Sequence, residues 1–162
     1  MAAPEFLVHA TEGWARVYAD SKALSTGVIF VHLAGMLLGG GVAVAADRQT
    51  LKAAREPEPV RADHLAFLGT VHGIAIAGLT LIALSGAAML LADLETFWSA
   101  KAFWIKMGLV AVLLANAGLM RRAERLAPAA PARAWIRLKA TSIASLVLWF
   151  AILLAGTILA SS

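Results

Sequence analysis

The 162-residue chain contains no cysteine. Disulfide bonds, cysteine-ligated zinc, iron–sulfur clusters and thiol nucleophiles are therefore excluded. Charged residues are also scarce, at 15% of the chain, whereas soluble domains carry about 25%. The sequence shows no nucleophile–base set, phosphate-binding loop or zinc motif. We therefore predict no catalytic residue and no enzymatic activity, and the composition argues against a free cytosolic enzyme.

Apolar residues make up 60% of the chain, and the mean hydropathy is +0.78. Crossing a bilayer takes about 20 predominantly apolar residues, and in hydrocarbon a helix satisfies its own backbone. Four stretches meet this requirement, at about residues 23–46, 65–92, 102–120 and 140–160. The predicted fold is therefore all-α: a polytopic membrane protein with a bundle of four transmembrane helices, surrounded by the lipid bilayer.

The basic residues predict the orientation of this bundle. Ten of the fourteen lysines and arginines lie in the connections 47–63 and 121–139. Because cytoplasmic loops carry an excess of Lys and Arg, both connections are expected in the cytoplasm and both termini in the periplasm. The predicted location is the bacterial inner membrane. The pI near 10 follows from this topology, so no nucleic-acid partner is predicted.

Residues 1–22 form a separate periplasmic segment in this scheme, and residues 23–162 form the transmembrane domain. Apolar side chains recur every three to four residues in the segment, which is typical of an amphipathic helix. We expect it to lie on the outer leaflet or to cap the bundle. The side chains are Phe6, Leu7, Ala10, Trp14, Val17 and Tyr18.

Small residues recur every fourth position on the first two predicted spans. The first set is Gly35, Gly39 and Ala43, and the second is Gly69, Gly73 and Ala77. Such faces let membrane helices approach closely, so we expect these two spans to pack on each other. Two alternatives stay open: space for a flat macrocycle, or docking of a protein partner or a second copy of the chain.

Ionisable side chains inside a membrane predict a functional site. A b-type haem between His32 and His72 is one hypothesis, although the two lie at depths that differ by about 10 Å at 1.5 Å per residue. A second hypothesis places copper, or a His/Met-ligated haem iron, on His32, Met36 and Met107, because imidazole and thioether ligands suit both metals. Met36 follows His32 by four residues and shares its helix face. Methionine also fills apolar gaps without any metal.

Two stretches resemble uncharacterised bacterial four-helix membrane families related to copper resistance protein D. The first is His32-Leu33-Ala34-Gly35 with the glycines up to Gly41 and Ala46-Asp47-Arg48. The second runs from Phe97-Trp98 through Phe103-Trp104-Ile105-Lys106-Met107-Gly108-Leu109. The resemblance implies a four-helix inner-membrane bundle, with His32 and Lys106 at positions that match the family pattern. It also implies copper uptake or haem-linked redox work.

These patterns predict a small inner-membrane protein that binds a redox metal centre, either copper or haem b, or that serves a redox complex. The alternative is a structural or assembly subunit without a cofactor, whose glycine faces dock onto partners. A third class, half of a dimeric transporter, requires a polar pathway or a broken helix. Only the Gly39-Gly40-Gly41 run indicates such a break.

Overall fold

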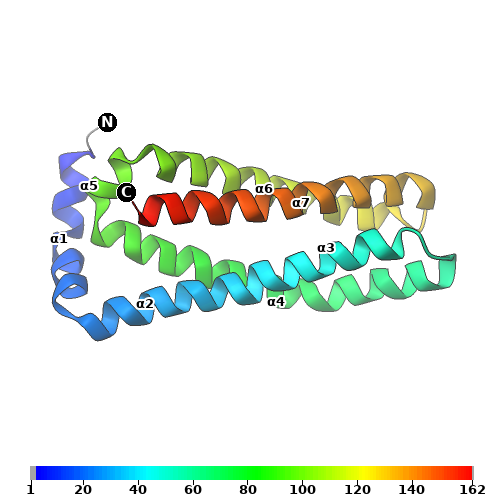
Figure 1. Ribbon diagram of the computed structural model, residues 1–162, viewed down its shortest axis with the longest axis horizontal. Helices are drawn as coiled ribbons and strands as arrows, with labels where there is room; N and C mark the ends of the chain where they lie inside the picture. The colour runs from blue at the N-terminus through cyan, green and yellow to red at the C-terminus, as the bar shows by residue number, and fades with distance from the viewer. Residues whose placement is uncertain (1–2, 162) are drawn as a thin grey trace.

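The computed structural model describes residues 3–161, and these contain helices and no strand. The chain folds back and forth along one long axis (Figure 1). In chain order the elements are α1 (Glu5–Asp20), α2 (Lys22–Gly35), the π-helix η1 (Met36–Gly41), α3 (Val42–Ala53), α4 (Glu58–Ala92), α5 (Leu94–Ser99), α6 (Lys101–Leu126) and α7 (Pro131–Ala160).

Four rods in the described part of the chain are long and apolar enough to cross a membrane, which confirms the predicted number. They are Lys22–Ala53, Glu58–Ala92, Lys101–Leu126 and Pro131–Ala160. Each rod contains one predicted range and extends beyond it, because polar residues at the ends of the apolar runs continue the helix. Prolines set two of the starts: α4 has a proline in its first turn and α7 begins on one, where the missing N–H costs nothing.

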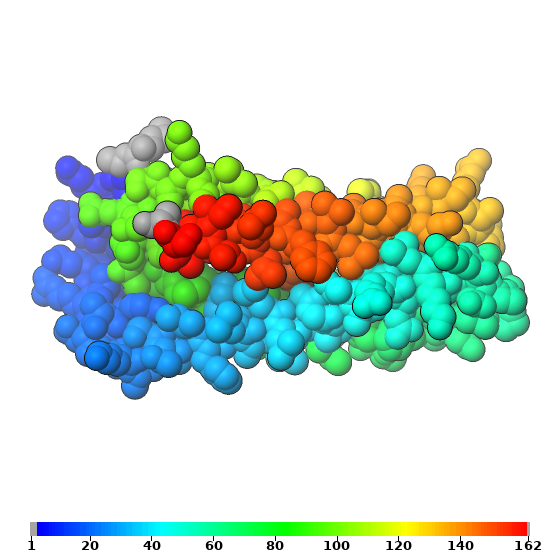
Figure 2. All heavy atoms as spheres, in the orientation of Figure 1, coloured from blue at the N-terminus to red at the C-terminus, as the bar shows by residue number. Residues whose placement is uncertain are grey.

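Two antiparallel hairpins make up the bundle. The continuous rod α2–η1–α3 packs on α4, and α6 packs on α7. The hairpins meet through α3 and α7, whereas in Figure 2 green atoms separate the end of α7 from α2. The α3–α4 and α6–α7 turns lie at one end of the molecule, and α1 and α5 lie at the other (Figure 1).

The first helix, α1, crosses the end of the bundle and contacts α2, α4 and α5. Trp14 Nε1 donates a hydrogen bond of 2.8 Å to the carbonyl of Ala88 in α4. This bond attaches α1 to the long helix, while Phe6 and Val17 remain exposed. In the structure this segment is helical over Glu5–Asp20 and lies over one end of the bundle.

Three glycines bring α4 against the first rod. A Cβ on Gly78 would overlap the backbone of Gly39, and a Cβ on Gly35 would lie 3.0 Å from the Gly78 carbonyl oxygen. The prediction that Gly69 and Gly73 form this contact is wrong, because both are exposed and a Cβ added to either would have no neighbour within 4 Å. The glycine run 39–41 belongs to η1, so the helix continues through a wide turn and is not broken.

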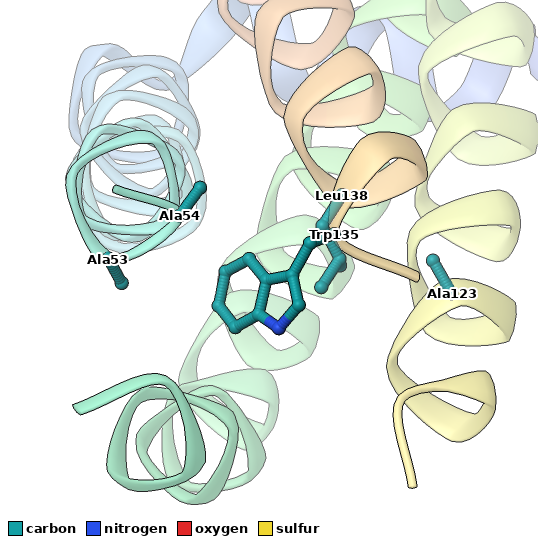
Figure 3. Close-up of a cluster of buried hydrophobic side chains, with 5 residues drawn as sticks. All are labelled: Ala53, Ala54, Ala123, Trp135 and Leu138. Carbon is teal, nitrogen blue, oxygen red and sulfur yellow. The ribbon is translucent and has the colours of Figure 1, made fainter. Parts of the chain in front are cut away.

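A small apolar cluster closes the end of the bundle that carries the two long turns. It contains Ala53, Ala54, Ala123, Trp135 and Leu138 (Figure 3). The Trp135 side chain is 5% exposed, and the guanidinium carbon of Arg61 lies 5.5 Å from its ring centroid. The indole therefore connects the α3–α4 turn to α7 at this end.

We expect Gly78→Ala to weaken the packing of α4 on the first rod, because the added methyl group would overlap the backbone of Gly39. Overpacking of this kind costs about 1–3 kcal/mol. The free energy of unfolding in mixed micelles measures this loss. Gly108→Ala, at an exposed helical glycine of α6 with no neighbour within 4 Å of its Cβ position, is the matched control and should be neutral or slightly stabilising. Equal stability of the two variants would contradict the close crossing.

Candidate functional site

Polar side chains occupy the inside of the bundle. The buried polar residues are Asp47, Thr50, His64, Ser85, Asn116, Thr141, Ser142 and Ser145, all between 0% and 8% exposed. Large apolar side chains lie on the outside, among them Leu37 at 74% and Phe30 at 69% exposure. Any site with polar chemistry in the described chain therefore lies between the helices.

His32 on α2 contacts α4 through a hydrogen bond whose direction can be inferred. Its Nδ1 lies 2.9 Å from Ser85 Oγ, and the Ser85 hydroxyl donates to the carbonyl of Leu81 at 2.5 Å. A hydroxyl carries a single proton, so His32 Nδ1–H is the donor to Ser85. The neutral ring then carries its lone pair on Nε2, the atom that a metal would need.

His64 on α4 forms the equivalent contact at the other end of the same helix pair. Its Nε2 lies 2.8 Å from Thr50 Oγ1 on α3, and that hydroxyl lies 3.0 Å from the carbonyl of Ala46, to which it donates. The His64 Nε2–H therefore donates to Thr50. Its ring also lies beside Trp135, with 6.3 Å between centroids. His64 is thus a structural link between α3 and α4.

The third imidazole faces the other hairpin. His72 Nε2 on α4 lies 3.6 Å from Glu124 Oε1 on α6. That carboxylate oxygen is buried without a hydrogen-bond partner. This pair of titratable groups therefore lies at the boundary between the two hairpins, beyond hydrogen-bond distance.

The structure does not bring His32 and His72 together. His32 is level with Ser85, which it contacts, and Ser85 lies thirteen residues beyond His72 on the same continuous helix. At 1.5 Å per residue this is about 20 Å along the axis. The two imidazoles of one chain therefore do not ligate a single haem iron.

The two methionines proposed as metal ligands together with His32 lie on different helices and differ in exposure. Met36 begins η1, one turn beyond His32, and is partly buried, whereas Met107 on α6 is 44% exposed. Lys106 turns inward instead, with Nζ 3.5 Å from the position of a Cβ on Gly156 of α7. Within residues 3–161, no group of three or more His, Cys, Asp or Glu side chains is arranged to hold a metal.

A cavity of about 370 Å³ lies between α3, α4, α6 and α7. Most of its lining is apolar, and its polar side chains include Asp47, His72, Asn116, Arg121 and Ser145. Asn116 Nδ2 donates to the carbonyl of Thr141 at 2.9 Å. The sequence analysis predicted no site at this cavity.

The sequence analysis placed Asp47 in a connection between spans, because it follows the first apolar run, and did not predict its burial. In the structure it lies inside the helical bundle, is 3% exposed and has Ser142 and Ser145 beside it. The spacing of those two serines on an apolar span was the available signal, since positions three apart share a helix face.

Comparison with known proteins identifies no relative. No family model, curated protein or solved structure matches the chain.

Proposed function

We propose that the chain is an integral inner-membrane protein that crosses the bilayer four times. The supporting observation is that apolar side chains cover the outside of the bundle and polar side chains occupy its inside. Only 11–17% of the residues in the most apolar part of each candidate span are buried, whereas Asp47, Thr50 and Ser142 are inside. In water this arrangement would expose a large apolar surface, which soluble monomers avoid. In lipid it is the expected arrangement.

The two basic connections support one orientation. They lie at the same end of the molecule, opposite α1 and the end of α7 (Figure 1), and ten of the fourteen basic residues belong to them. We assign this end to the cytoplasm, and the opposite end, with α1 and the end of α7, to the periplasm. The exposed side chains Phe6 and Val17 of α1 then insert into the outer leaflet as an amphipathic helix would.

The function that the interior supports best is that of a cofactor-free structural subunit. His32 and His64 already link neighbouring helices through Ser85 and Thr50, so their burial has an explanation without a metal. Such bonds between membrane helices contribute about 0.6 kcal/mol each. The buried imidazoles therefore hold the bundle in register and need no other role.

The exposed stripe Gly69, Gly73 and Ala77 on α4 is where we expect assembly. All three residues are exposed, and nothing lies within 4 Å of a Cβ placed on either glycine. A stripe with this spacing can pack against an identical stripe around a two-fold axis. We therefore take a second copy of the chain as the partner of this face.

A second candidate function is a redox metal centre, copper or haem, at His32. One observation favours it: Ser85 fixes the imidazole with an unprotonated Nε2, as the partners of metal-ligating histidines do. Met36, one turn further along, is the nearest thioether in sequence. His32 thus fits such a centre as one ligand, and the bound metal would supply the redox chemistry.

The absence of cysteine gives a direct test of the topology. A membrane-impermeant maleimide should label Ser99→Cys in intact spheroplasts, because Ser99 ends α5 at the outer end. Ala129→Cys, in the α6–α7 turn, should react only after permeabilisation. The reverse pattern would invert the proposed orientation, and labelling of both variants in a soluble fraction would contradict membrane insertion.

Assembly through the α4 stripe predicts a dimer in mild detergent, measured by light scattering coupled to size exclusion. Gly73→Leu should shift the protein to monomer, because a bulky side chain separates the two backbones. Gly108→Leu, at an equally exposed glycine of α6, is the control and should leave the dimer intact. A wild-type monomer, or equal effects of both substitutions, would contradict this interface.

The two candidate functions separate in the same preparation by visible absorption and by iron and copper content. The structural function predicts a colourless protein without stoichiometric metal. A metal centre predicts one metal per chain that His32→Ala removes and His64→Ala retains, because His64 uses its Nε2–H in the Thr50 contact. Retention of the metal in both variants would exclude His32 as its ligand.

A further inference from the structure

One carboxylate in the described interior has no compensating positive charge. Asp47 is 3% exposed, and its Oδ2 has no hydrogen-bond donor. Ser142 Oγ on α7 is also buried without a partner, at 0% exposure. Ser142 and Ser145 lie close enough to donate to Asp47, but neutral hydroxyls leave its negative charge without a counter-charge. Burying an ionised carboxylate without a counter-charge is costly, which indicates that a cation belongs beside it.

The surroundings of Asp47 supply oxygen atoms from two helices of the other hairpin. Ser142 and Ser145 lie almost one turn apart on α7, and both are beside the carboxylate. Asn116 on α6 lines the same cavity as Asp47 and Ser145. Because its Nδ2 is bonded to the Thr141 carbonyl, its oxygen remains available as an acceptor.

The charged groups around the cavity do not neutralise Asp47. Arg121 and His72 line the cavity, but within residues 3–161 the only ion pairs at 4.0 Å or less are Arg16–Glu12 and His72–Glu124. The cavity therefore offers one carboxylate, neutral hydroxyl and amide oxygens, and no adjacent ammonium or guanidinium group on that carboxylate.

We propose that Asp47, Ser142 and Ser145 bind a small monovalent cation, with Na⁺ as the best fit, at the wall of this cavity. Hard cations take oxygen ligands from carboxylates, amides and water. A single carboxylate balances one positive charge. The volume of about 370 Å³ is room for about ten water molecules at 30 Å³ each, so a partly hydrated ion can be accommodated.

The test measures the unfolding midpoint of the full chain in detergent at constant ionic strength, with NaCl replaced stepwise by choline chloride. A ligand that binds only the folded state stabilises it in a saturable way. We expect Na⁺ to raise the midpoint with saturation, and Asp47→Asn to abolish this response. Asp63→Asn, an exposed acid on α4, is the control and should respond as wild type does.

Ser142→Ala and Ser145→Ala test the same ligand set without removing the charge, and each should raise the apparent Kd for Na⁺ about tenfold.

Equal midpoints in Na⁺ and choline for the wild-type chain would overturn the proposal. So would an infrared band of a protonated carboxyl group that Asp47→Asn removes at neutral pH, because a proton would then take the place of the cation. Stabilisation by Ca²⁺ but not by Na⁺ would overturn the monovalent assignment. The α4 dimer and the His32 metal are measured separately, so failure of either leaves this result unaffected.

Discussion

The close contact of Gly39 with Gly78 sets the register of the first hairpin. Two backbones meet where neither residue carries a side chain, which fixes the position of one rod along the other. His32 lies seven residues before Gly39, and Ser85 lies seven residues after Gly78, so the antiparallel register places them opposite each other, and they are hydrogen-bonded. Towards the other end the same packing brings Thr50 to His64. In hydrocarbon, where apolar side chains gain nothing by leaving lipid, close backbone approach and polar bonds supply the specificity.

The second hairpin joins the first through α7, towards the end of the molecule that carries the two long turns. Helix α7 packs on α3, and Asp47 faces Ser142 and Ser145 at this junction. A bulky side chain at Gly40 would collide with Trp149, whose ring atoms lie 2.9 Å from a Cβ at that position. The π-helical turn and its glycines therefore serve both neighbours: they admit α4 on one side and the indole of α7 on the other.

The apolar runs predicted four spans correctly because the thickness of hydrocarbon dictates their length. The apolar runs did not predict the helix ends. Polar residues extend the first rod to Ala53 and start α4 at Glu58, before His64. For the same reason, depths counted from the predicted span ends separated His32 from His72 by about 10 Å, whereas the packed helices separate them by about 20 Å. Glycine spacing identified a smooth face on α4 but not the helix that it faces. The stripe at Gly69 and Gly73 points outward, whereas Gly78 and Gly86 face the first rod.

The distribution of buried charge bears on transport. The acidic side chains Asp47 and Glu124 lie towards the end that carries the basic turns, whereas Lys106 turns inward in the other half of the bundle. In the proposed orientation, a cation moving from Asp47 towards the other end would meet the contact of Gly39 with Gly78 and then Lys106, which repels a cation when it is protonated. Repulsion between like charges is large where water is scarce. In the proposed orientation the site would therefore hold a cation that enters from the end with the basic turns, and the other half of the bundle would oppose its passage.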